Sequence, residues 1–127
     1  MNVDTEQQVR ALAIGRVVLG ASFLAAPGLS LRNWLGREHD TPVARVAMRM
    51  VGGRDIALGV GTIFALRHGA PVRGWLEAAA LSDSTDVVAS LFAARHLPKV
   101  RVLGAGLSAA GAVVMARRLI PKVAATP

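Results

Sequence analysis

The chain contains no cysteine, and aromatic residues make up only 4% of it. Without cysteine it can form no disulfide framework, no thiolate zinc site and no cysteine nucleophile. The few aromatic side chains leave little surface on which nucleic-acid bases could stack. These absences exclude several classes of scaffold and disfavour a nucleic-acid partner.

Charged residues are also scarce. They account for 18% of the 127 residues, whereas a typical soluble domain is about one quarter charged, and 53% of the residues are hydrophobic with a mean hydropathy of +0.45. The net charge is +7, but the basic residues stand mostly at the ends of apolar segments instead of forming one patch. Basic residues in such positions are typical of membrane boundaries, so we expect a lipid bilayer as the partner.

Four apolar segments are separated by short polar connections. Each is about 20 residues long, which matches the hydrocarbon thickness of a bilayer, and none alternates as a strand would. Short connections favour antiparallel neighbours. The sequence therefore predicts an all-α, antiparallel four-helix transmembrane bundle in the cell membrane. It would form a single domain, 1–127, with spans at about 8–28, 43–66, 72–94 and 101–118.

The start of the second segment carries the clearest local signal. Asp40-Thr41-Pro42 offers a capping side chain followed by a proline in the first turn, a combination that favours helix entry. The orientation of the bundle stays open, because positively charged residues are equally numerous on the two sides. The first segment does not resemble a signal peptide, because Asp4 and Glu6 precede it and Arg16 interrupts it.

Charged residues inside these segments require partners, because an unpaired charge in hydrocarbon costs at least roughly 2.5–3.5 kcal/mol. Helices joined near residues 67 to 71 place Asp55 level with Asp83. Similar counting places Arg16 level with Glu77, and we expect these two to pair. The sequence predicts a polar centre of three positive and four negative residues: Arg16, Arg49, Arg54, Asp55, Glu77, Asp83 and Asp86.

Helical spacing also predicts which faces meet. Asp83, Asp86 and Ser90 share one face of the third helix. On the second helix, Gly52 and Gly59 lie on the same broad face as Asp55 and would let a neighbouring backbone come close. We expect at least one of Arg49 and Arg54 to lie within ion-pair reach of Asp55, Asp83 or Asp86.

The stretch RMVGGRDIALG resembles a signature of small bacterial four-span membrane proteins of unknown function. That signature is Arg-x-x-Gly-x-Arg-Asp-x-x-x-Gly, and the acidic stretch at residues 82 to 86 looks like the same family's acidic site. The layout is more loosely similar to DoxX-type proteins. The resemblance implies a four-helix membrane fold and no established activity. The paired glycines at 52 and 53 are the departure from its pattern.

Several functions fit these patterns. The first is a non-catalytic membrane subunit or small-molecule-binding accessory, with a membrane-protein partner or a second copy of the chain beside it. The second is a membrane-embedded enzyme or proton-coupled carrier that uses the same polar centre. Interhelical ion pairs that only fix register, and a soluble alanine-rich four-helix bundle, are further readings. No catalytic residue or cofactor is assigned, because the sequence contains no Ser-His-Asp arrangement and nothing that requires a bound nucleotide. No metal is assigned, because the nearby arginines disfavour a divalent metal ion between Asp83 and Asp86.

Overall fold

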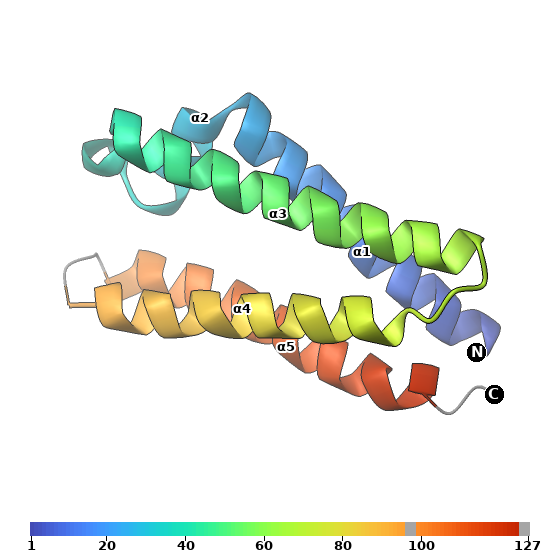
Figure 1. Ribbon diagram of the computed structural model, residues 1–127. Coiled ribbons are helices and arrows are strands. Elements are labelled where there is room, and N and C mark those ends of the chain that lie inside the picture. Colours follow the sequence, from blue (N-terminus) through green and yellow to red (C-terminus); the bar gives the residue numbers. More distant parts are fainter. Residues whose placement is uncertain (96–98, 125–127) are drawn as a thin grey trace.

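The computed structural model describes residues 1–95 and 99–124, with the side chains of the second range given from Leu107 to Val123. In these residues all regular structure is helical, which confirms the all-α prediction (Figure 1). The elements follow in the order α1 (Val3–Ala25), α2 (Pro27–Trp34), the 3-10 helix η1 (Arg37–His39), α3 (Pro42–Arg67), α4 (Arg73–Ala93) and α5 (Lys99–Ala124).

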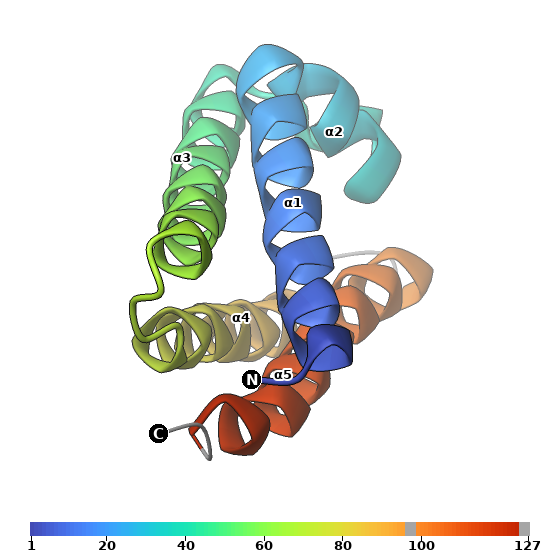
Figure 2. The ribbon, with the colours of Figure 1, turned by 90° about the vertical axis from the view of Figure 1, so that its right-hand side faces the viewer.

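The long helices form two pairs. Helix α1 packs along α3, and α4 packs along α5. In the turned view of Figure 2, the α1/α3 pair lies above the α4/α5 pair. Consecutive long helices run in opposite directions, so the beginning of α1 and the end of α5 lie at the same end of the molecule (Figure 1).

Helix starts follow the expected chemistry. The Thr41 hydroxyl accepts a hydrogen bond from the Ala44 N–H at 3.2 Å, and Pro42 occupies the first turn of α3. Pro42 fits there because its missing N–H would have no partner inside the helix. At α1 the Asn2 side chain accepts from the Thr5 N–H at 2.8 Å. The second expected span is therefore helix α3, as the signal at residues 40 to 42 predicts.

A short helix interrupts the expected first span. Ala26 leaves the helical conformation because it precedes Pro27, whose ring clashes with an α-helical residue before it. The chain then re-enters a helix with Pro27 in its first turn. Helix α2 thus turns back onto α1 and α3, where Leu31 packs with Phe23 and Met48. The sequence prediction continued the first span to residue 28 and did not include α2.

The approach of α1 to α3 depends on glycine. A Cβ atom added at Gly52 would lie 2.6 Å from the carbonyl oxygen of Gly20, and one at Gly59 would lie 2.6 Å from that of Ala13. Neither position accepts a side chain without moving backbone. The prediction that Gly52 and Gly59 admit a neighbouring backbone is confirmed, and the neighbour is α1.

Outside the long helices, Asp40 joins α2 to the start of α3. Its carboxylate accepts hydrogen bonds from Arg45 Nε at 2.6 Å, Arg45 Nη2 at 2.9 Å and Arg32 Nε at 2.6 Å. These bonds, with the Arg45 contribution larger than the Arg32 contribution, hold the pKa of Asp40 well below its ordinary value. The loop is thereby fixed against both helices.

By length and hydropathy, one helix in the described part of the chain could cross a membrane. This helix is α1, with a mean hydropathy of 1.4 over its best stretch. Helices α3 and α4 are long enough, but charged residues in their middle turns interrupt every apolar stretch that could span the hydrocarbon of a bilayer. The expectation of four spans is therefore not confirmed by composition alone.

Candidate functional site: a charged centre beside a cavity

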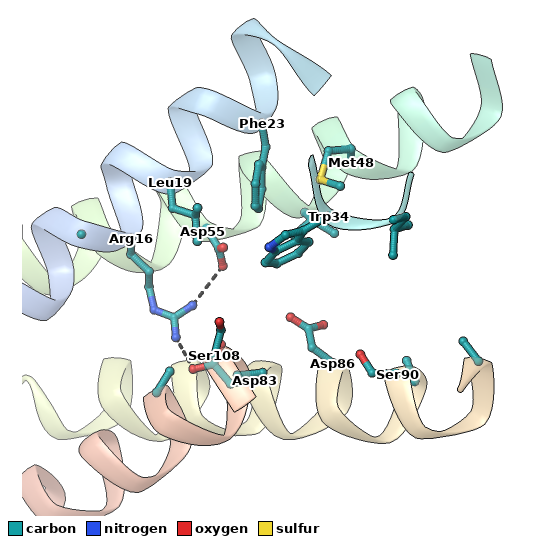
Figure 3. Close-up of a pocket in the computed structure, with 17 residues that line it drawn as sticks. Arg16, Leu19, Phe23, Trp34, Met48, Asp55, Asp83, Asp86, Ser90 and Ser108 are labelled. Atoms are coloured by element: carbon teal, nitrogen blue, oxygen red, sulfur yellow. Dashed lines mark hydrogen bonds and ion pairs between the residues drawn. The ribbon is translucent and has the colours of Figure 1, made fainter. Parts of the chain in front are cut away.

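Arg16 connects both helix pairs. Its Nη1 donates to Asp55 Oδ1 on α3 at 2.9 Å, and its Nη2 donates to Asp83 Oδ2 on α4 (Figure 3). The three side chains are 9%, 6% and 8% exposed. All three are thus more than nine-tenths buried, and each charge is compensated within hydrogen-bond distance.

Arg54 makes a second connection. It holds Asp86 through two bonds, Nη1 to Oδ1 at 2.9 Å and Nη2 to Oδ2 at 2.8 Å, and its Nη2 lies 3.3 Å from Asp55 Oδ1. Such a bidentate pair fixes orientation as well as charge. Arg54 and Asp86 are more accessible, with side chains 32% and 37% exposed. We call the joined set the polar centre: Arg16, Arg54, Asp55, Asp83 and Asp86.

Helical spacing explains how the polar centre assembles. Asp83 and Asp86 stand three residues apart on α4 and both face the α1/α3 pair. Asp55 lies on the buried face of α3 with Gly52 and Gly59, so the close approach of α1 brings Arg16 to it. The prediction that Arg49 or Arg54 would reach an aspartate is confirmed by Arg54.

The predicted pair of Arg16 and Glu77 is wrong. Glu77 instead pairs with Arg73 one turn earlier on α4 at 2.7 Å, and both side chains are about half exposed. The error comes from the start of the first helix. Helix α1 begins at Val3 and not near residue 8, so Arg16 lies roughly 7 Å deeper along the helix than the sequence suggested.

Arg49 is also outside the polar centre. It is exposed and makes no ion pair within the described residues. The buried face of α3 contains Met48, Gly52, Asp55, Gly59 and Thr62, and Arg49 projects about 100° from Met48. The expected polar centre therefore loses Arg49 and Glu77 and keeps its other five members.

A cavity of about 420 Å³ adjoins the polar centre (Figure 3). Arg16, Asp55, Asp83 and Asp86 line one side of it, whereas Arg54 does not line it. The remaining wall is mostly apolar. It consists of large side chains from the α1/α2/α3 side, including Phe23, Trp34 and Met48, and of small residues from α4 and α5, including Ala89, Ser90, Ser108 and Ala112.

Trp34 was missed as a cavity residue. In the sequence Trp34 follows the first apolar segment and lies in a polar connection, whereas the structure places it on α2 with its ring 5.5 Å from that of Phe23. No pattern in the sequence indicates this, because α2 itself is not apparent before the fold is known. Ser90, in contrast, faces the cavity beside Asp86, on the helix face that the sequence predicted.

Two carboxylates of the polar centre, those of Asp55 and Asp83, keep unused acceptor capacity. Asp55 Oδ1 accepts from both arginines, and Asp83 Oδ2 accepts from Arg16. The second oxygen of each aspartate accepts no hydrogen bond from the described part of the chain. Among those same residues, no group of three or more His, Asp or Glu side chains is arranged to hold a metal ion.

No protein-family model, curated protein or solved structure matches this chain. The site must therefore be interpreted from its own geometry. It is a cavity with three carboxylates and one guanidinium on one side and an apolar wall opposite.

Proposed function

We propose that this chain is a multi-pass protein of the cell membrane that holds a small amphiphilic molecule beside the polar centre. It would act as a non-catalytic membrane subunit or binding accessory. The observation that carries the proposal is the distribution of polarity, with charges gathered inside and large apolar side chains outside. The Arg-x-x-Gly-x-Arg-Asp stretch, which resembles a signature of small four-span membrane proteins, is a second ground for the proposal.

Support for a lipid environment comes from the outer surface. Met50 on α3 is 71% exposed, and Phe92 on α4 is 70% exposed. Similar exposed residues lie along all four long helices: Ile14, Val18, Val60, Phe64, Leu81, Leu91, Val114 and Met115. A soluble bundle requires polar outer faces, because monomeric proteins rarely expose extended apolar patches to water. A bilayer would cover these side chains.

Support for binding comes from the cavity. Its volume of about 420 Å³ lies within the usual range for small-molecule sites, roughly 300–1,000 Å³. Such sites combine an apolar wall with a few converging polar groups. The cavity has both, and the ion pairs hold its polar side in a fixed geometry. A cluster that only fixed register would not need this space.

Membrane residence is tested by fractionation. We expect the protein to stay with the membranes through high-salt and carbonate washing and to leave them only in detergent. Recovery in the carbonate supernatant would refute membrane residence.

Binding is tested on the full chain in detergent by calorimetric titration with cyclohexylmethanol, a neutral amphiphile. The variant Ala112→Phe fills the cavity from α5, and Leu107→Phe changes an exposed residue of the same helix. We expect a heat of binding for the native chain and for Leu107→Phe, and none for Ala112→Phe. Equal heats for all three proteins would indicate partition into detergent and would contradict binding in the cavity.

A proton-coupled carrier is the second candidate, because both arginines connect the α1/α3 pair to α4. In a carrier these ion pairs would have to break and re-form as the two pairs of helices move. The experiment that separates the candidates is uptake of the same compound into vesicles containing the protein. A binding accessory would show binding without uptake driven by a pH gradient.

A further inference from the structure

We infer that the cavity takes a cationic amphiphile, a protonated amine attached to an apolar body. This inference rests on the proposed binding function and adds the chemical class of the head group. It is carried by the charge of the cavity wall, by the unused acceptors on that wall, and by the apolar surface opposite.

The charge of the polar centre is unbalanced. Three aspartates face two arginines, so the ionised set has an excess of one negative charge. The imbalance is larger at the cavity itself, where Asp55, Asp83 and Asp86 are lining residues and Arg16 is the only one of the two arginines that lines it. A buried excess charge is costly, and a monovalent cation in the cavity would compensate it.

The unused hydrogen-bonding groups also favour a donor. Each Nη atom of Arg16 and Arg54 already donates to a carboxylate. Arg54 Nε is buried without a hydrogen-bond partner in the described part of the chain, but Arg54 does not line the cavity. Acceptors, in contrast, remain available on Asp55 and Asp83, each of which has one oxygen without a hydrogen bond from the described residues. An ammonium group has donors and no acceptor, so it complements this set.

The opposite wall suits an apolar body. Phe23, Trp34 and Met48 present aromatic and thioether surface, and Ala112 with Ala89 leaves space on the other side. Figure 3 shows the Asp86 carboxylate on α4 pointing into the space beneath the Trp34 ring. An ammonium that donates to the unused oxygens of Asp55 and Asp83 would also lie near the negative charge of Asp86. The electron-rich face of the Trp34 indole is a further favourable neighbour for a cation in this cavity.

The test compares three probes with the same body and different head groups: cyclohexylmethylammonium, cyclohexylmethanol and cyclohexanecarboxylate. Each is titrated at pH 7 into the native chain in a neutral detergent, with Ala112→Phe as the reference for detergent partition. We expect the ammonium to bind at least tenfold more tightly than the alcohol and the carboxylate to bind most weakly. Equal affinity of ammonium and alcohol, or tighter binding of the carboxylate, would overturn the inference and leave the binding function intact. Failure of all three probes would overturn both.

Charge variants make the test specific to the site. Asp83→Asn removes one charge from the cavity wall, and Glu77→Gln makes the same change on an exposed part of α4. We expect Asp83→Asn to reduce the preference for ammonium over alcohol by about tenfold and Glu77→Gln to leave it unchanged. If Asp83→Asn does not fold, Asp86→Asn makes the same charge change at a more accessible lining position. If the variant that folds, Asp83→Asn or Asp86→Asn, still prefers ammonium over alcohol as strongly as the native chain does, the proposed contact between the ammonium and these carboxylates is refuted.

Discussion

Arg16 and Asp83 are hydrogen-bonded across the boundary between the two helix pairs, although 67 residues separate them in the chain. Asp55 shares the same guanidinium from the other side. Arg16 therefore separates two carboxylates that would otherwise face each other. Removal of the Arg16 guanidinium should therefore lower the free energy of unfolding by more than the loss of a single ion pair would, because two buried carboxylates lose their partner.

The first prediction concerns this arginine. Arg16→Met leaves Asp55 and Asp83 buried without their common partner, and we expect a loss of roughly 3–5 kcal/mol in the free energy of unfolding. The double variant Arg16→Met/Asp83→Leu should recover much of this loss, because it also removes one of the stranded charges. Thermal unfolding in detergent measures the cycle. Arg10→Met, at an exposed pair with Glu6, is the control and should cost less than about 1 kcal/mol. Additive effects of the two changes would contradict the contact.

The second prediction compares neighbouring glycines. Gly52→Ala places a methyl group against the Gly20 carbonyl oxygen and should destabilise the protein by about 1–3 kcal/mol, because backbone must move. Gly53→Ala meets no atom within 4 Å and should stabilise α3 by roughly 0.5–1 kcal/mol. The difference in melting temperature between the two variants measures the contact. Equal effects would mean that α1 does not approach α3 at Gly52.

The third prediction concerns acid. The pKa of Asp40 is lowered in the folded protein, so its ion pairs stabilise the fold above the ordinary value of 3.8, and this contribution falls as the pH drops below that value toward the folded pKa. Asp40→Asn should therefore lower the melting temperature at pH 6 more than at pH 3. Glu38→Gln, in the same loop, should show a smaller pH dependence. The same difference at both pH values would be inconsistent with the bonds from Arg32 and Arg45.

The fourth prediction separates lipid from water on the outer surface. Leu81 lies near the middle of α4 with 71% of its surface exposed. In a bilayer Leu81→Lys should cost roughly 2.5–3.5 kcal/mol and reduce the amount of protein in the membrane fraction. On a water-exposed helix the same change should stay within about 0.5 kcal/mol. Leu81→Met is the control for the loss of the leucine. Normal membrane levels and stability of the lysine variant would argue against lipid at this face.

The residues of the polar centre could be predicted where depth along neighbouring helices decides the contact. Counting from the turn near residues 67 to 71 brings Arg54 and Asp55 close to the aspartates of α4, and the structure joins Arg54 to Asp86. Helical periodicity likewise places Asp83 and Asp86 on one face. These are properties of single helices and of one short connection, and the sequence specifies them directly.

The partner of Arg16 could not be predicted in this way. Its depth depends on where α1 begins, and the capping bond from Asn2 moves that start to Val3. Its neighbour depends on the glycines that draw α1 onto α3, which fix a contact only once the two helices are known to be adjacent. The cavity also depends on α2, because Pro27 can end one helix or begin another. Tertiary packing decides each of these points.

The ion pair between Arg54 and Asp86 joins residues that are synthesised at different times, so the order of synthesis determines when it can form. The polar-centre residues of α1 and α3 sum to one positive charge, whereas α4 contributes two negative charges. A ribosome that makes the chain from its amino terminus releases Arg54 before Asp86, which follows 32 residues later. If the helices enter a bilayer, the first pair reaches it with a guanidinium that has not yet met its main counter-ion. In that case α1 and α3 become stably inserted only when α4 enters the bilayer and its aspartates compensate the charge of the arginines.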